Sequence, residues 1–250
     1  MKKILLFLII SLHIHAQTII TDRPDQTESS STVERGSVQI ESGILITQNE
    51  ILNQFNIPII EKNIYLPSTL FRLGLTDKIE LRVFNQYQYN YTQINSVNGF
   101  NNLELGLKIQ LFKKENNMTE LAFLSHISIP TAPSTFNENS GKYIGLINKL
   151  CISHHLNNQI GIGYNLGYNY FDSGLSDYTY SLVVGFKLNE RISAYIEPYG
   201  QISEFEDSEA NINMGMTYLI KDNLQLDYSY GAGLNNISNF MSIGCSINIL

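Results

Sequence analysis

Long stretches in which polar and apolar residues alternate constrain this chain more than any other feature of its sequence. Between positions 78 and 91, isoleucine, leucine, valine and tyrosine occupy most odd positions, while charged and amide residues occupy most even ones. Between positions 102 and 111 the pattern repeats, with leucine or isoleucine at every odd position. Because successive side chains of a β-strand point to opposite faces, each stretch gives a strand with one apolar and one polar face. Such a strand is suited to lie between hydrocarbon and water.

Twelve segments of the chain alternate in this way, and all but the ten-residue stretch at 102–111 have about 11–14 residues. The usual strand of a globular protein has about 5–6 residues, whereas a tilted strand that crosses a bilayer needs about 9–11. Bacterial outer-membrane barrels have an even number of strands. We therefore predict an all-β fold, a closed antiparallel transmembrane β-barrel of about 12 strands. The segments lie near residues 37–47, 63–75, 78–91, 102–111, 118–130, 142–153, 159–171, 177–188, 191–203, 209–220, 223–234 and 239–250.

The connections between these segments alternate in length. Those near 76–77, 189–190 and 221–222 are tight turns, and those near 48–62 and 131–141 are longer loops. Short periplasmic turns and longer outer loops are typical of outer-membrane barrels. The alternative fold is a soluble β-sandwich, whose strands do not each need one apolar face and one charged face.

The first sixteen residues have the pattern of a secretory signal peptide. Lys2 and Lys3 precede an apolar run from Ile4 to Leu12, and the small residue Ala16 marks the expected cleavage site. This run is too short to span a bilayer, and no later stretch approaches the ~18 consecutive apolar residues of a membrane helix. We therefore expect export to the cell outer membrane. The expected organisation is a signal peptide at 1–16, an N-terminal lumen or plug segment at 17–36, and an outer-membrane β-barrel at 37–250.

Charge argues against nucleic-acid binding, and the positions of the cysteines argue against a disulfide. The formal net charge is -7, and signal-peptide cleavage would remove two lysines as well. So acidic a chain is a poor nucleic-acid binder, and no nucleic-acid partner is expected. Of the two cysteines, Cys151 shares an inward face with Lys149, and Cys245 alternates with Ile243 on an outward face. Two side chains so placed cannot approach, so we expect no disulfide.

Tyrosines on the apolar faces are expected near the strand ends that adjoin the longer loops. Tyrosine prefers the membrane–water interface, because its ring is apolar and its hydroxyl is hydrated. We expect an aromatic girdle on the outer side of the barrel, although strand propensity alone also places tyrosine in strands. The residues are Tyr87, Tyr89, Tyr91, Tyr168, Tyr170, Tyr178, Tyr180, Tyr228 and Tyr230.

The polar faces that would line the lumen carry nearly equal numbers of positive and negative side chains. Such a balance argues against a filter for ions of one sign. Two interpretations stay open: a polar path for translocation, and an internal network of ion pairs that fills and stiffens the barrel. The residues are Glu41, Arg72, Lys78, Glu80, Arg82, Glu104, Lys108, Glu120, His126, Lys149, Lys187, Arg191, Glu197 and Asp227.

An enzyme of the outer-membrane lipase type is a rival class of function. Its chemistry needs a histidine within hydrogen-bond reach of a serine on the lipid face. His126 is expected to face inward, and His154 and His155 lie in a short turn without the further ligands of a metal shell. The acidic loop at 204–209 lacks the spacing of a calcium loop. We therefore assign no catalytic, cofactor-binding or metal-binding residue, and we expect no cofactor.

Residues 17–36 are polar and do not alternate, and we expect them inside the barrel. Twelve tilted strands about 4.8 Å apart give a backbone diameter of roughly 24 Å, and inward side chains leave a bore of about 10 Å. Charges of this segment can pair with Arg72, Arg82, Lys108 and Glu104, and inward glycines between 159 and 250 leave room for its backbone. The alternative is a disordered periplasmic tail. The candidate lumen and translocation residues are Asp22, Arg23, Asp25, Glu41, Arg72, Glu80, Arg82, Glu104, Lys108, His126 and Asp227.

The opening of this segment resembles a known family. Thr21–Glu28 reads TDRPDQTE, and the pattern G-x-x-Q-I-E-x-G follows over Gly36–Gly43. Both are similar to the start of the outer-membrane transporters named for the MetA pathway of phenol degradation. Leu73–Arg82, Leu103–Lys108 and Gln225–Leu234 agree with it, so the resemblance covers nearly the whole mature chain.

This resemblance implies an outer-membrane β-barrel that acts as a transporter or diffusion channel for small solutes, aromatic or apolar ones among them. The alternatives are a non-transporting structural or adhesion barrel and the lipase-type enzyme. The expected partners are outer-membrane lipid and lipopolysaccharide, the barrel assembly machinery and a small-molecule solute.

Overall fold

Twelve antiparallel strands close into a barrel, and a short thirteenth strand, β4 (Ser96–Phe100), lies against one of them. The computed structural model describes residues 18–52, 55, 57–93, 95–113, 119–133, 142–174, 176–204 and 207–249. The predicted signal peptide, residues 1–16, falls outside this range. The barrel strands are β1 (Val38–Leu52), β2 (Pro58–Thr76), β3 (Ile79–Tyr91), β5 (Leu103–Lys113), β6 (Thr119–Ile129), β7 (Gly145–His155), β8 (Ile160–Phe171), β9 (Ser176–Lys187), β10 (Ile192–Ser203), β11 (Asp207–Lys221), β12 (Leu224–Gly233) and β13 (Ser238–Ile249).

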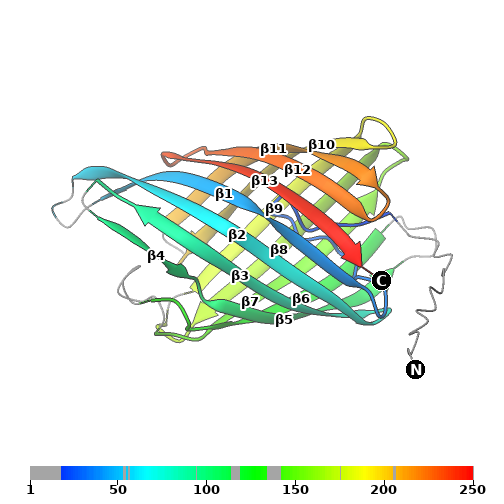
Figure 1. Cartoon of the computed structure of the whole chain (residues 1–250), viewed down its shortest axis with the longest axis horizontal. Coiled ribbons are helices and arrows are strands. Elements are labelled where there is room, and N and C mark those ends of the chain that lie inside the picture. Colours follow the sequence, from blue (N-terminus) through cyan, green and yellow to red (C-terminus); the bar gives the residue numbers. More distant parts are fainter. Residues whose placement is uncertain are drawn as a thin grey trace, which may run out of the picture.

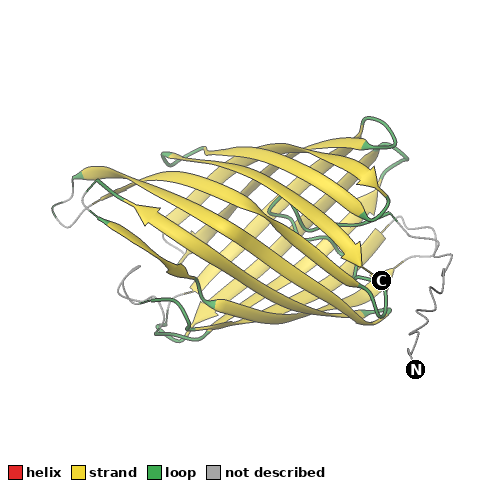
Figure 2. Cartoon of the chain, viewed as in Figure 1, coloured by secondary structure: helices red, strands yellow, loops and turns green. Residues whose placement is uncertain are grey.

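The first and last strands close the barrel. β1 pairs antiparallel with β13, from Val38 opposite Ile249 to Asn49 opposite Ser238, and with β2 on its other side. Figure 1 shows the blue β1 beside the red β13, with all strands tilted against the long axis of the barrel. Figure 2 shows that strands make up almost the whole wall. The predicted twelve-stranded antiparallel barrel is confirmed.

The connection at 92–101, between the predicted segments 78–91 and 102–111, contains a strand. β4 pairs with residues 87–91 of β3, the part nearest the outer loops. β5 pairs only with the half of β3 that is farther from the outer loops, Ile79–Phe84. The reason is that two asparagines at 101–102 interrupt the chain between β4 and β5. β4 therefore continues the wall beyond the end of β5. Five residues are too few to show a clear alternating pattern, which is why the sequence did not reveal this strand.

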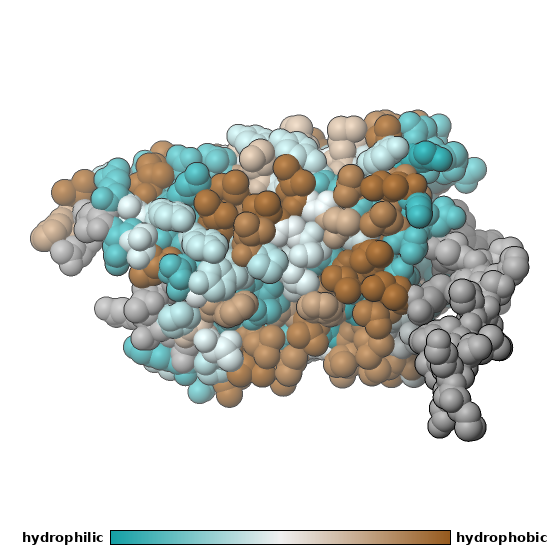
Figure 3. Space-filling view, in the orientation of Figure 1, coloured by the Kyte–Doolittle hydropathy of each residue, from teal (hydrophilic) through white to brown (hydrophobic). Residues whose placement is uncertain are grey.

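The barrel is apolar outside and polar inside. On β5 the outward side chains of Leu105 and Leu107 are 39% and 42% exposed, whereas the inward Lys108 is fully buried. Apolar side chains cover much of the barrel face in Figure 3. Most of the described residues that are buried are polar or charged. This reverses the pattern of a water-soluble protein and suits a wall between hydrocarbon and an enclosed polar lumen.

The tyrosines face outward as expected, but one of them lies at a different height. Tyr168 of β8 and Tyr178 of β9 pack with ring centroids 5.0 Å apart near the outer loop that joins these strands. Tyr230 lies near the outer end of β12 and is 46% exposed. Tyr228, however, lies halfway along β12, opposite Ile243 of β13, so its predicted place at a strand end is wrong. Alternation fixes the face of a residue but not its depth in the membrane.

Three cations that the sequence placed on the lumen face are not enclosed. Lys78 lies exposed in the turn between β2 and β3, and Arg191 lies exposed in the turn between β9 and β10. Lys187 contacts Glu190 at 2.7 Å beside the same turn. The strands end before they can enclose these side chains, so all three lie at the end of the barrel that carries the short turns.

Both cysteines are free, which confirms the prediction. Cys151 of β7 is buried against Ala122 and Leu124 of β6, and Cys245 belongs to β13, which does not pair with β7. The part of the chain that the structure describes contains no helix long and apolar enough to cross a membrane. Within the same residues, no three His, Cys, Asp or Glu side chains are grouped so that they could hold a metal ion.

Candidate functional site: the barrel lumen

Residues 18–37, here called the lumen segment, run inside the barrel and enter and leave it at the same end. The backbone N–H of Ile19 donates to the carbonyl of Asp222, in the turn between β11 and β12, at 2.8 Å. The Thr32 hydroxyl donates to the carbonyl of Asp77, in the turn between β2 and β3, at 3.3 Å. Both are short turns, so this end is the periplasmic one in the expected orientation. The segment is the dark blue stretch enclosed by the strands in Figure 1.

Asp22 of the lumen segment lies among three buried cations. Its carboxylate is 2.6 Å from the guanidinium of Arg82 and 2.9 Å from the ammonium of Lys108. The guanidinium of Arg72 is 3.3 Å away. Burial alone would raise the pKa of Asp22, but Arg72, Lys108 and Arg82 together hold that pKa well below its usual range. Asp22 is therefore an anion here.

Two glutamates of the wall complete this network. Arg72 lies 2.9 Å from Glu41 and 2.8 Å from Glu80, and both glutamates are fully buried. Glu41 also accepts the backbone N–H groups of Asp22 and Arg23, each at 3.0 Å. Buried charges are tolerated only when they are paired and hydrogen-bonded. Three wall cations face only two wall carboxylates at this point, so the lumen segment supplies negative charge that the wall lacks.

Arg23 reaches across to the last two strands. Its guanidinium contacts the Asp227 carboxylate on β12 at 3.0 Å and the Ser242 hydroxyl on β13 at 2.7 Å. It lies against Gly43 of β1 and Gly244 of β13, which are paired opposite each other. A Cβ atom at Gly43 would lie 2.6 Å from Nη2 of Arg23, and one at Gly244 would collide as well. These two glycines provide the space that the guanidinium occupies.

Most other inward glycines do not make room for the lumen segment, contrary to the prediction. Gly215 lies against the ring of Tyr195, and Gly231 lies against the ring of Phe240. Of the inward glycines of β8 to β12, Gly163 is the one for which an added Cβ atom would contact the segment closely. Gly167, Gly215 and Gly231 make room for side chains of neighbouring strands, whereas at Gly161 and Gly185 the nearest atom to an added Cβ would be 3.8 and 3.9 Å away.

Glu197 of β10 anchors the far side of the lumen segment. This buried carboxylate accepts the backbone N–H of Gln26 at 2.9 Å and that of Thr27 at 2.7 Å, together with the Thr27 hydroxyl at 2.6 Å. The Thr27 hydroxyl also lies 2.8 Å from that of Ser181 on β9. Asp25 lies close by, and no cation is paired with it among the described residues. Burial, and then the negative charge of Glu197, raise the pKa of Asp25 well above its usual range.

The rest of the segment is held by side chains of several strands. Glu28 contacts Arg82 at 2.7 Å, and its backbone N–H donates to the side-chain oxygen of Asn165 on β8 at 2.7 Å. The Ser31 hydroxyl donates to Glu120 of β6 at 2.7 Å. The lumen segment is thus bonded to strands on all sides of the barrel.

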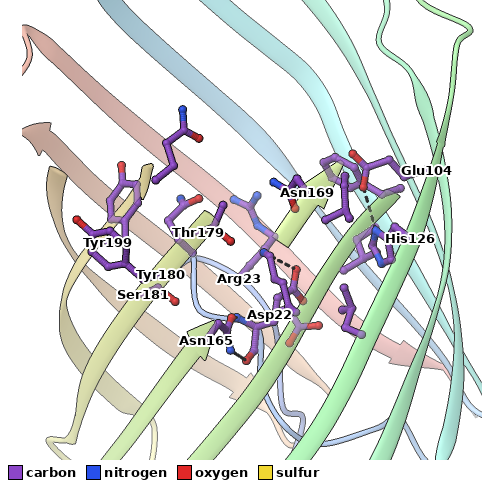
Figure 4. A pocket seen from close by; sticks show the side chains of 18 of the residues that line it. Asp22, Arg23, Glu104, His126, Asn165, Asn169, Thr179, Tyr180, Ser181 and Tyr199 are labelled. Atoms are coloured by element: carbon purple, nitrogen blue, oxygen red, sulfur yellow. Dashed lines mark hydrogen bonds and ion pairs between the residues drawn. The ribbon is translucent and has the colours of Figure 1, made fainter. Parts of the chain in front are cut away.

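On the side of the longer loops, the lumen segment borders a cavity of about 470 Å³, here called the outer cavity. Figure 4 looks into it: Asp22 and Arg23 lie between a wall that carries Tyr199 and an opposite wall that carries Glu104 and His126. Glu104 and His126 contact each other at 2.9 Å. A second cavity of about 460 Å³, here called the rim cavity, shares Phe84, Glu104 and Ile147 with the outer cavity and continues it toward the loops.

A third cavity of about 450 Å³ lies on the periplasmic side of the lumen segment, and we call it the periplasmic cavity. Thr21 and Asp25 line it from the segment, and Tyr195 lines it from the wall. Among the described residues, Arg23 is the one that lines both this cavity and the outer cavity. The lumen segment around Arg23 therefore separates the two ends of the lumen.

All eleven predicted lumen residues lie inside the barrel. The prediction that Glu104 pairs with the lumen segment is wrong, since Glu104 lies farther toward the loops and contacts His126 instead. Whether these residues form a translocation path stays a prediction. Asp22, Glu41, Arg72, Glu80, Arg82 and Lys108 form one network, Arg23 pairs with Asp227, Glu104 pairs with His126, and Asp25 lies beside Glu197.

Sequence reasoning missed several residues that hold the lumen segment. Thr27, Asn165 and Ser181 are among them, because hydroxyl and amide residues are common on every inward face. Asn165 lies on the same face of its strand as Gly163 and Gly167, which were predicted to point inward. This position was the sequence feature that could have identified it. Nothing in the sequence distinguished Thr27 from the other hydroxyl residues near it.

The structure resembles solved outer-membrane barrels. An outer membrane channel from Pseudomonas putida F1 matches with a TM-score of 0.68 and 11% identity, over 88% of this chain and 98% of that chain. The KdgM porin in complex with disordered oligogalacturonate matches with a TM-score of 0.56 and 7% identity, over 84% and 98%. The translocator domain of the autotransporter NalP from Neisseria meningitidis matches with a TM-score of 0.52 and 7% identity, over 86% and 88%. Identities this low show a shared fold alone.

The sequence comparison is more specific. No curated protein matches the chain. A family model matches most of the chain, beginning at the TDRPDQTE motif that carries Asp22 and Arg23. With residues 21–239 matched, the chain belongs to the family described as "Putative MetA-pathway of phenol degradation".

Proposed function

We propose that this chain is an outer-membrane channel for small solutes and that its lumen segment keeps the channel closed on the periplasmic side. The observation that carries this proposal is the position of Arg23 between the outer and periplasmic cavities. The two cavities approach each other from opposite ends, and the lumen segment lies between them. Membership of the family and the likeness to an outer membrane channel support transport.

The remaining expectations about export and partners belong to the same proposal. Residues 1–16 direct export and are cleaved, the assembly machinery inserts the barrel, and the outward face contacts outer-membrane lipid and lipopolysaccharide. No catalytic role is proposed. His126 lies inside the lumen with Glu104, and the His154 ring is 3.2 Å from the Tyr164 hydroxyl and 3.1 Å from that of Thr119.

The paired charges also support a second candidate, a structural barrel that conducts nothing. Asp22 contacts three cations, and Arg23 has a carboxylate of its own. A segment held this firmly could be a permanent filling. The two candidates differ in one property, which is whether solutes cross the lumen when the segment leaves it.

Deletion of residues 18–34 tests the proposal directly. The barrel strands begin at Val38, so the wall stays intact. We expect assembled barrels, identified by heat-modifiable migration on gels, to show larger single-channel conductance in planar bilayers than the full chain. Cells that carry the deletion should become more sensitive to bulky antibiotics. An assembled deletion variant that conducts no more than the full chain would favour the structural barrel.

A reversible crosslink gives the matched control, because one sample is compared with itself. The hydroxyls of Thr27 and Ser181 lie 2.8 Å apart, so Thr27→Cys and Ser181→Cys bring two thiols within bonding reach. Cys151→Ala and Cys245→Ala remove the native thiols. The oxidised protein should show fewer openings than the same protein after reduction. Equal traces before and after reduction would mean that the segment does not gate the lumen.

A further inference from the structure

The solutes that fit this lumen differ from those that the family description suggests. We propose that the rim cavity, at the loop end of the lumen, binds neutral, polyhydroxylated solutes, such as short uncharged glycans, rather than aromatic or apolar ones. This inference rests on the proposed channel function and names its substrate class. It comes from the lining of the outer and rim cavities, which can bind a solute without any movement of the lumen segment.

The rim cavity is lined largely by amides. Of the fifteen residues that line it, seven are asparagine or glutamine. An amide side chain offers two N–H donors and a carbonyl acceptor, so a wall of amides matches solutes whose hydroxyls both donate and accept. At about 460 Å³ the cavity lies within the range of roughly 300–1,000 Å³ of sites that hold small molecules.

These amides are ordered by bonds to one another. The Asn63 side-chain oxygen on β2 accepts N–H groups of Gln88 and Asn90 on β3, each at 2.7 Å. Asn90 also donates to Glu61 at 2.7 Å. No bond among the described residues engages the side-chain oxygen of Gln88 or the side chain of Asn49. The wall is therefore preorganised and still has groups free for a solute.

The charges that line the two cavities disfavour anionic solutes. Every cation that lines them has a carboxylate partner: Arg82 contacts Glu28 at 2.7 Å, and Lys149 contacts it at 3.7 Å. Arg23 has the partner described above, and the ring of His126 lies against the carboxylate of Glu104. Glu61 and Glu209 line the rim and outer cavities and form no ion pair within the described residues. An anion would meet no unpaired positive charge and two carboxylates.

An apolar solute would gain little in the rim cavity, whose lining is mainly polar. It would displace water from the amides without replacing the hydrogen bonds, which costs free energy for each polar group left unpaired. The side-chain oxygen of Asn169 on β8 is buried at the outer cavity without a described hydrogen-bond partner, so it too can accept a hydrogen bond from a solute hydroxyl. The rings of Tyr65, Phe84 and Tyr199 lie among the amides and offer flat faces for a sugar ring.

Calorimetric titration of the detergent-solubilised mature chain tests the inference with three probes: maltotriose, which is neutral, trigalacturonate, which is anionic, and phenol. We expect maltotriose to bind more tightly than either of the others. Tighter binding of trigalacturonate or phenol, or no binding of maltotriose, would overturn the inference. Because titration does not depend on conductance, a larger conductance of the 18–34 deletion would leave the channel function standing after such a failure.

Paired variants locate the binding. Asn63→Leu combined with Gln88→Leu removes two amides of the rim cavity and should weaken maltotriose binding about tenfold, as expected for two lost hydrogen bonds. Asn98→Leu is the matched control, because Asn98 is exposed on β4 and its oxygen accepts the Tyr87 hydroxyl outside the lumen. If the double variant does not assemble, Gln88→Leu alone should weaken binding severalfold. Unchanged binding in the variant that assembles would overturn the assignment.

Discussion

The two halves of the lumen are built from the same strands but differ in what fills them. In the periplasmic half, the lumen segment packs against charged side chains that are almost completely buried, including Arg72, Glu80 and Lys108. In the outer half, amides such as Asn63 and Gln88 border open cavities. The polar side chains of the inward face therefore have two roles. In the periplasmic half they hold the lumen segment, and in the outer half they leave hydrogen-bonding groups free.

The difference follows from the energetics of buried charge. A charge that loses water must gain partners, and a filled lumen requires a complete set of them. Asp22 provides part of that set from outside the wall, since it contacts cations on three strands. Amides carry no net charge and tolerate either water or a solute. An amide wall therefore remains stable whether it is occupied or empty, which suits the half of the lumen that stays open.

The largest expected difference between the halves comes from removing one polar side chain from each. Arg72→Ala leaves Glu41 and Glu80 buried without their main cation and should destabilise the protein by about 3–5 kcal/mol. Gln88→Ala removes one neutral hydrogen bond and should cost about 1 kcal/mol. Urea unfolding followed by gel migration measures both. Equal losses would show that the two halves do not differ as described.

A smaller effect is expected from filling the space beside Arg23. Gly244→Ala places a methyl group against the guanidinium, because the three atoms nearest to its added Cβ all belong to Arg23, and it should weaken docking of the lumen segment by about 1–3 kcal/mol, the usual cost of overpacking. The readout is the fraction of time the channel is open in a bilayer. Gly161→Ala is the control, because it is also an inward glycine and the nearest atom to its added Cβ would be 3.8 Å away. If both variants open equally often, Arg23 is not tightly seated.

The fold could be predicted because a barrel wall depends on one local property. Alternation at period 2 fixes the face of every residue, and the run from Leu103 to Leu111 shows this face clearly in the sequence alone. Depth and closure are not local. Tyr228 was misplaced in depth, and β4 was missed, because neither depends on which face a residue occupies.

The site could be predicted in composition but only partly in its pairing. The sequence identified the inward charges, and it placed Asp22 with Arg72, Arg82 and Lys108 because opposite charges in a narrow interior must meet. It could not show that Glu104 lies too far toward the loops to join them. Nor could it show that Glu197 binds backbone N–H groups of the lumen segment, since a backbone donor leaves no mark in a sequence.

The smallest expected effect is a dependence of closure on pH that originates at Asp25. Its neighbours Glu197, Asp22 and Glu28 are acids, and no described cation is paired with it, so its pKa is raised well above the usual 3.8 when the segment is docked. A docked state that holds the proton more tightly is favoured at low pH and loses that advantage as pH rises from 3.8 through the raised value. Asp22 acts in the opposite direction, but only below its usual 3.8, because its pKa is lowered. Above pH 3.8, the open fraction should therefore rise with pH in the native chain and rise less steeply in Asp25→Asn, where an amide keeps the neutral form. An equally steep rise in Asp25→Asn would assign the pH dependence to another group.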